Sequence, residues 1–151
     1  MDHDVYISIK GLHQVEDMDG NDHEIEMVST GHYYKRNGLQ CVSYTEQFGV
    51  NDNPVKALVK IEDGALTVSR SGDMAGHLQF EAGRRSQSYF ETPFGVMEMG
   101  VTTQDLQMKL EEHNWHIKVN YALDINNQYS GEHEVVIKVQ DTKGHRDIRL
   151  V

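Results

Sequence analysis

The sequence has little positive charge, one cysteine and no basic cluster. Its 14 Lys and Arg residues are outnumbered by 24 Asp and Glu residues, which gives a formal net charge of −10. Nucleic acids and anionic membrane surfaces are bound through clustered positive charge, so neither is an expected partner. The single cysteine, Cys41, excludes an intramolecular disulfide and fits a reducing compartment.

Signals for targeting and membrane insertion are also missing. Residues 1–6 are acidic and lack the apolar run of a signal peptide. No stretch approaches the roughly 20 apolar residues of a transmembrane helix. A chain of 151 residues is long enough to form one domain with its own core. We therefore expect a single domain over residues 1–151 in the cytoplasm.

Motifs of nucleotide binding and common catalysis are absent from the sequence. There is no phosphate loop, dinucleotide fingerprint or Gly-x-Ser-x-Gly elbow. The nine His residues include no pair with the spacing of a zincin or zinc finger. His113 and His116 are three apart and would lie on opposite faces of a strand. The sequence thus predicts no metal site, no cofactor and no catalytic residue.

Cys41 is expected to be a surface thiol on the outer face of its strand. A catalytic thiol needs an electropositive setting and a nearby base. A diagonal contact with His32 is the alternative, but the surrounding sequence is acidic and offers little to lower the thiol pKa.

The clearest structural signal is a β-hairpin over residues 24–48, turned at Asn37-Gly38. Asn-Gly suits a type I′ turn, in which both central residues have positive φ, and this fixes the register. Counting outward pairs Gly31 with Tyr44, and side chains alternate between two faces. The more apolar face, which should point to the core, comprises Ile25, Met27, Ser29, Gly31, Tyr33, Val42, Tyr44, Glu46 and Phe48.

A second hairpin turns at Asp63-Gly64, which pairs Glu62 with Ala65. Its apolar face is therefore also expected to point to the core. This face comprises Val55, Ala57, Val59, Ile61, Leu66, Val68 and Arg70.

The rest of the chain continues in short strands with turn signals about every ten residues. Residues 115–125 form the clearest strand, in which every second residue is apolar. The apolar parity switches between Val101 and Leu106, which indicates a β-bulge or, alternatively, a single helical turn. Nine or ten strands without a helix favour an all-β fold, a single antiparallel meander closed into a barrel of about 8–10 strands. Residues 143–151 could add an edge strand.

Several segments also carry a family resemblance. They are Thr30-Gly31-His32-Tyr33-Tyr34, Ser43-Tyr44-Thr45-Glu46, Val59-Lys60-Ile61, Arg70-Ser71-Gly72, Phe94-Gly95 and the strand around Tyr121. In this order they resemble the YwiB-like family, uncharacterised bacterial proteins with a calycin-type, lipocalin-like β-barrel. The resemblance spans most of the chain and implies the barrel fold. It implies no activity, since fold does not fix function.

Two charged residues are predicted inside the barrel. Glu46 and Arg70 fall on core faces through independent registers, and a buried charge without a partner is costly. The first interpretation is a Glu46–Arg70 ion pair near a barrel mouth. The second is a polar anchor in a ligand cavity, in which Arg70 receives a carboxylate or phosphate. Ser29, Tyr33 and Tyr44 would line the same region.

Three functions follow from these expectations, in decreasing order of support. The first is a cytoplasmic barrel that binds a small amphipathic or anionic ligand at its mouth. The second is an interaction or self-associating module that uses the outer face of the first hairpin. The third is an enzyme with Glu46 as general base. The outer face in question comprises Val28, Tyr34, Leu39 and Cys41.

Overall fold

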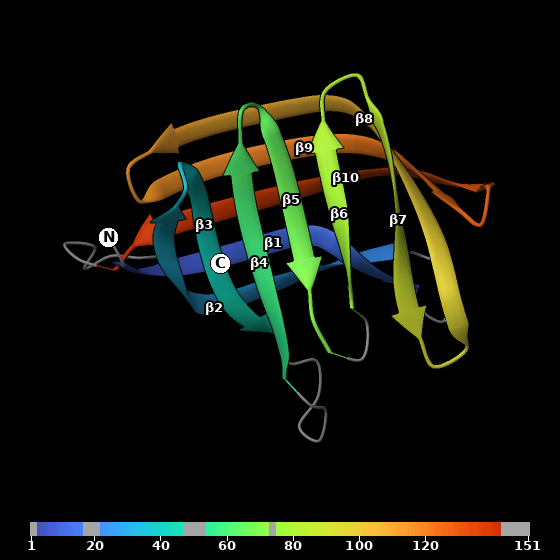
Figure 1. Ribbon diagram of the computed structural model, residues 1–151, viewed down its shortest axis with the longest axis horizontal. Helices are drawn as coiled ribbons and strands as arrows, with labels where there is room; N and C mark the ends of the chain where they lie inside the picture. Colours follow the sequence, from blue (N-terminus) through green and yellow to red (C-terminus); the bar gives the residue numbers. More distant parts are fainter. Residues whose placement is uncertain (1–2, 17–21, 47–53, 73–74, 143–151) are drawn as a thin grey trace.

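The computed structural model describes residues 3–16, 22–46, 54–72 and 75–142, with the side chains of residues 12–16, 22–25 and 92 left undescribed. These residues form ten strands and contain no helix (Figure 1). The strands are β1 (His3–Glu16), β2 (Asp22–Arg36), β3 (Leu39–Glu46), β4 (Val55–Glu62), β5 (Ala65–Arg70), β6 (Gly76–Glu81), β7 (Arg85–Thr92), β8 (Gly95–Glu111), β9 (Asn114–Ile125) and β10 (Gln128–Asp141). Three predictions fall outside the described residues: the inward orientation of the Ile25 side chain, that of Phe48, and an edge strand over residues 143–151.

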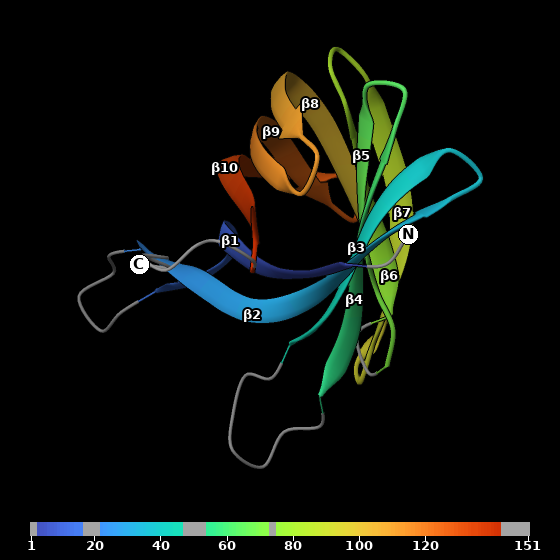
Figure 2. The same ribbon diagram turned by 90° about the vertical axis from the view of Figure 1, so that its left-hand side faces the viewer.

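All ten strands belong to one antiparallel sheet in the order β6-β5-β4-β3-β2-β1-β10-β9-β8-β7. Every neighbour in this order is also a neighbour in sequence except β1 and β10, the first and last strands. The sheet curls so that β3–β7 form one wall and β8–β10 the facing wall (Figures 1 and 2). The predicted meander barrel is confirmed.

The barrel is nearly closed at the seam between β6 and β7, the two edges of the sheet. The Glu91 amide donates to the Ala75 carbonyl at 3.2 Å, and the Ser88 hydroxyl donates to the His77 carbonyl. The ring of Phe90 occupies the space where a side chain at Gly76 would project. A backbone hydrogen bond and side-chain contacts thus join β6 to β7, in place of a continuous strand ladder.

The predicted hairpin registers are confirmed because the turn residues adopt the backbone they were expected to need. Asn37 has a φ of 53° and Gly38 of 82°, and Gly31 pairs with Tyr44 as expected. Asp63 and Gly64 have φ values of 35° and 79°. In that second hairpin Ala57 pairs with Arg70.

A β-bulge explains the parity switch in β8. The register with β9 shifts between Thr103 and Asp105, so the alternative of a helical turn is wrong. A second shift in β1 lies between Lys10 and His13, next to Gly11, whose φ is 93°. A Cβ on Gly11 would overlap the Glu134 carbonyl of the neighbouring strand β10, so glycine is required there.

The core fills the interior with aliphatic and aromatic side chains from both walls. Phe80 of β6 packs against Tyr121 of β9 with ring centroids 5.0 Å apart, and Tyr33 of β2 contacts Trp115 of β9 at 5.9 Å. The fully buried apolar side chains include Val5, Ile7, Val42, Val59, Leu66, Phe80, Val101, Ile117, Val119 and Ile137. They lie on the strand faces that the alternation predicted to point inward.

The expectation that Cys41 is a surface thiol is wrong, because the residue is only 3% exposed. It does lie opposite Tyr34, as the register predicted, and its other neighbour is Lys60. Both neighbours have long side chains that can cover a small thiol on a curved outer face. Burial raises the pKa of Cys41, and the positive charge of Lys60 offsets this only in part.

We predict that folded protein protects this thiol. Cys41 should react with Ellman's reagent at least roughly ten times more slowly in the native state than in urea, since reaction needs an exposed thiolate. A Cys41→Ala/Thr45→Cys variant is the control, because Thr45 is exposed on the same strand. Native Cys41 reacting as fast as the cysteine placed at Thr45 would contradict the burial.

Candidate functional site

Glu46 and Arg70 form an ion pair inside the barrel, as the first interpretation of the sequence predicted. Arg70 Nε donates to Glu46 Oε1 at 2.7 Å and Arg70 Nη2 donates to Glu46 Oε2 at 3.4 Å. The Glu46 side chain is 0% exposed and that of Arg70 is 14% exposed. Two N–H groups of one guanidinium thus contact the two oxygens of one carboxylate, the arrangement that planar groups favour.

The strand ladder explains how the two side chains meet. Glu46 is the last residue of β3 and Arg70 is the last residue of β5, with β4 between them. Tyr44 pairs with Ala57, and Ala57 pairs with Arg70. The small Ala57 side chain leaves room for the long Arg70 side chain to cross β4 toward Glu46. The pair therefore lies where these strands end, at one mouth of the barrel.

Tyr44 adds a buried hydroxyl next to the ion pair. Its ring is 6% exposed and its Oη atom has no hydrogen-bond partner among the described residues. Burial raises the pKa of Tyr44 well above its ordinary value, and the Glu46 charge raises it further, while Arg70 lowers it. The hydroxyl is therefore a neutral proton donor, held within the field of both charges.

The facing wall contributes a second row of polar side chains. Thr103 of β8 pairs with Tyr121 of β9, which pairs with His133 of β10. The Tyr121 and His133 ring centroids are 5.6 Å apart. Thr103 Oγ1 and His133 Nε2 are buried without a partner among the described residues. These three residues escaped the sequence analysis because their alternation marked them only as strand residues.

Arg70 links the two rows electrostatically. Burial raises the pKa of Tyr121 to about 12, and the positive charge of Arg70 opposes this rise. The positive charge of Arg70 also lowers the pKa of Tyr44, against the effect of burial. We call the group the inner polar cluster; it comprises Tyr44, Glu46, Arg70, Thr103, Tyr121 and His133.

Of the remaining predicted site residues, the structure places Ser29 near this cluster and Tyr33 elsewhere. The Ser29 hydroxyl lies 2.9 Å from the Thr30 carbonyl and 3.4 Å from the carbonyl of Thr45, which precedes Glu46. The Tyr33 hydroxyl donates to Gln40 at 3.1 Å. Its ring meets His113 edge-on at 4.8 Å, toward the opposite end of the barrel.

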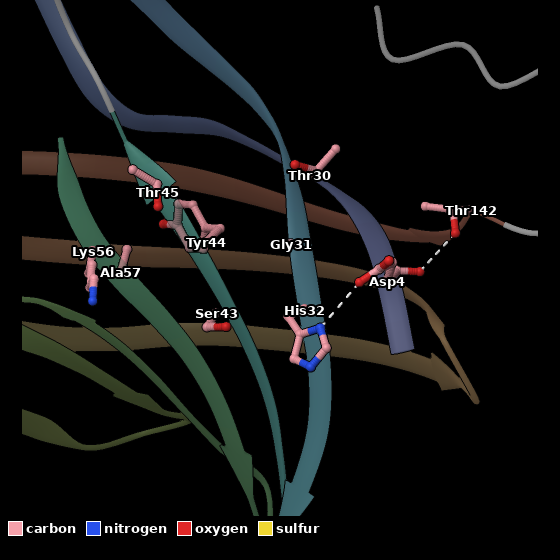
Figure 3. Close-up of a pocket in the computed structure, with 10 residues that line it drawn as sticks. All are labelled: Asp4, Thr30, Gly31, His32, Ser43, Tyr44, Thr45, Lys56, Ala57 and Thr142. Carbon is pink, nitrogen blue, oxygen red and sulfur yellow. Dashed lines mark hydrogen bonds and ion pairs between the residues drawn. The ribbon is translucent and has the colours of Figure 1, made fainter. Parts of the chain in front are cut away.

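A groove of about 780 Å³ lies along β1–β4 and shares Tyr44 with the inner polar cluster (Figure 3). Its best-defined feature is Asp4, whose carboxylate lies 3.2 Å from His32 Nδ1 and whose carbonyl accepts from Thr142 Oγ1 at 3.1 Å. The groove is lined by Asp4, Thr30, Gly31, His32, Ser43, Tyr44, Thr45, Lys56, Ala57 and Thr142. Because Arg70 is not among these residues, a cavity that reaches Arg70 stays a prediction.

Comparison with known proteins places the chain in a family. The family model "Domain of unknown function (DUF1934)" matches residues 7–137. The chain belongs to this family. It is 29% identical over 123 residues to the "Uncharacterized beta-barrel protein YwiB" of Bacillus subtilis (strain 168), covering 82% of this chain and 84% of that protein.

A solved structure supports the same fold. The crystal structure of the ywiB protein from Bacillus subtilis superposes with a TM-score of 0.76 at 27% identity, covering 94% of each chain. The predicted resemblance to the YwiB-like family is therefore confirmed, as is the barrel. YwiB is itself described as uncharacterized, so function must be argued from the side chains of this DUF1934 member. Its described residues contain no helix long and apolar enough to cross a membrane.

We predict unequal costs for breaking the ion pair. Arg70→Met leaves a fully buried carboxylate and should lower the free energy of unfolding by about 3–5 kcal/mol. Glu46→Leu should cost less, because the partly exposed Arg70 can turn toward water. The double variant Glu46→Leu/Arg70→Met should recover most of the loss, since neither charge then remains. Urea unfolding of all four proteins measures this, and strictly additive losses would contradict a direct pair.

The raised pKa of Tyr121 predicts a loss of stability at alkaline pH. The folded protein keeps the phenolic proton up to about pH 12, whereas an unfolded tyrosine loses it near about pH 10. The unfolded state binds fewer protons in this window, so stability falls as pH rises, by about 1.4 kcal/mol per pH unit for this group. Urea midpoints should fall less steeply for Tyr121→Phe than for the native protein. Parallel pH profiles would contradict the assignment.

Proposed function

We propose that the protein is a binding module that holds one small anionic or amphipathic ligand inside the barrel, at the mouth formed where β3 and β5 end. The observation that carries this proposal is the inner polar cluster, which combines an ion pair with buried hydroxyl and imidazole groups that have no partner among the described residues. A small barrel of the lipocalin-like kind suits a single enclosed ligand.

The unpartnered atoms make the case for an occupant. Tyr44 Oη, Thr103 Oγ1 and His133 Nε2 are all buried. A buried polar atom without a hydrogen bond costs about 1–3 kcal/mol, and native interiors keep few of them. Water or a ligand inside the barrel would supply the missing bonds. Two of the three atoms are hydroxyls that can donate, which favours a ligand rich in acceptor oxygens.

The ion pair gives the site its orientation. Glu46 holds the Arg70 guanidinium at 2.7 Å, so the positive group is fixed before any ligand arrives. A carboxylate or phosphate is the group that a guanidinium binds best. Partly buried apolar side chains, including Leu78 and Leu123, pack against the core and could contact the apolar part of an amphipathic ligand.

The alternative functions have less support. A general base must accept a proton from substrate, whereas the Glu46 carboxylate is engaged by Arg70. On the outer face of the first hairpin, which the interaction hypothesis uses, Val28 is exposed but Cys41 is buried. Apolar side chains that are more exposed than Val28 occur around β7 and β8, namely Tyr89, Phe94 and Val96. The proposed location, the cytoplasm, is supported by the lone cysteine.

Native mass spectrometry of protein purified from its own host tests for a carried ligand. An added mass of one small molecule per chain is expected. A chain that carries no added mass and also fails the probe experiment below would overturn the proposal.

The probe experiment uses 8-anilinonaphthalene-1-sulfonate, a fluorescent anion with an apolar body. Arg70→Gln should weaken its binding at least tenfold, which corresponds to about 1.4 kcal/mol. Arg85→Gln is the matched control, because Arg85 pairs with Asp124 on the outer surface at 2.8 Å. Tyr44→Phe, which removes only a hydroxyl, tests the site without disturbing the ion pair. Equal affinities for the native, Arg70→Gln and Tyr44→Phe proteins would contradict binding at the cluster.

A further inference from the structure

We infer that His3, His113 and Asp141 form a site for one divalent transition metal ion of the Zn²⁺ class, at the opposite end of the barrel from the inner polar cluster. His3 begins β1, Asp141 ends β10, and His113 lies in the turn between β8 and β9. Three segments that are distant in sequence thus converge at one point. Nothing in this inference depends on the proposed ligand.

The donor atoms are spaced as a metal ion requires. His3 Nε2 lies 2.6 Å from Asp141 Oδ1, and His113 Nδ1 lies 3.7 Å from Asp141 Oδ2. All three ligand atoms lie within 4.8 Å of one another. Bonds of about 2.0–2.2 Å in tetrahedral geometry place ligand atoms about 3.4 Å apart. The observed distances bracket this value.

One ring must turn for the ion to bind. The His3 and His113 rings are stacked, with centroids 4.0 Å apart and planes inclined by 10°. A metal ion lies in the plane of each imidazole that binds it, and two parallel planes share no such position. The edge-on contact of Tyr33 restrains His113. We therefore expect His3, at the start of its strand, to be the ring that tilts.

Charge and exposure suit a bound cation. The side chains of His3, Asp141 and His113 are 16%, 22% and 26% exposed, so an ion can reach them from solvent. Two neutral imidazoles and one carboxylate carry a single negative charge, and the chain as a whole carries −10. Two His and one acidic ligand, with a fourth position left to water, are a usual zinc set. The Asp141 amide also donates to Asn114 Oδ1 at 3.3 Å, which helps to position the residue.

The chain supplies its own control for a plain His–Asp ion pair. His32 Nδ1 lies 3.2 Å from Asp4 Oδ1. Among the described residues, however, this pair does not belong to a group of three possible metal ligands. If a His–Asp contact were sufficient to bind a metal ion, both places would do so. If three ligands are needed, only His3, His113 and Asp141 will.

The test is metal binding by protein whose affinity tag has been removed. Calorimetric titration with Zn²⁺ should show one ion per chain, and Co²⁺ should develop the visible absorption of tetrahedral coordination. His113→Ala and Asp141→Asn should each weaken Zn²⁺ binding at least about 100-fold, because even the loss of a group that only hydrogen-bonds to a metal ligand costs about 10–100-fold. His32→Ala should leave affinity and spectrum unchanged.

Folding is checked separately so that every result bears on the site. His113→Gln serves as a second variant that retains a polar side chain of similar size, and circular dichroism confirms that each variant is folded. Equal Zn²⁺ affinity in the native and folded His113 variants would overturn the inference, as would loss of binding in His32→Ala alone. Arg70→Gln should bind Zn²⁺ like the native protein, which separates this site from the proposed ligand site.

Discussion

The buried ion pair between Glu46 and Arg70 ties three neighbouring strands of the barrel to one register. Its 2.7 Å bond forms only if β3, β4 and β5 keep their observed register. A slip of one residue in either hairpin would turn one of the two side chains to the outer face. Where Arg70 is the side chain displaced, Glu46 would remain fully buried with an unpaired charge, at a cost of several kcal/mol. The ion pair therefore favours the correct register over slipped ones, even if it adds little to the free energy of unfolding.

The distribution of side chains divides the interior into regions with different physical roles. Aliphatic residues such as Val59, Leu66 and Ile117 fill the middle of the barrel and supply the hydrophobic stabilisation. The inner polar cluster lies beyond them, toward the mouth where β3 and β5 end. An ordinary core would place apolar residues there too, since buried polar atoms without partners reduce stability. Retaining them makes sense where the interior meets an occupant.

Much of the fold could be predicted because hairpin register is local information. Asn37-Gly38 and Asp63-Gly64 fix the pairing of four strands, and from that pairing Glu46 and Arg70 could be brought together without a structure. The facing row of Thr103, Tyr121 and His133 could not be found in this way, because it comes to face Glu46 and Arg70 only through the curvature of the whole sheet. Cys41 was misplaced for a related reason: alternation gives the face of a side chain but not how far its neighbours cover it.

The His3, His113 and Asp141 group shows the same limit in its strongest form. His3 and Asp141 are 138 positions apart and meet because β1 pairs with β10, the one pairing in the described sheet between strands that are not consecutive in the sequence. Joining the ends of so long a loop carries the largest chain-entropy cost in the meander. A metal ion that binds the folded state but not the unfolded chain would offset part of that cost by mass action. Such a site would thus stabilise the pairing of the first and last strands of the barrel, far from the mouth where the proposed ligand binds.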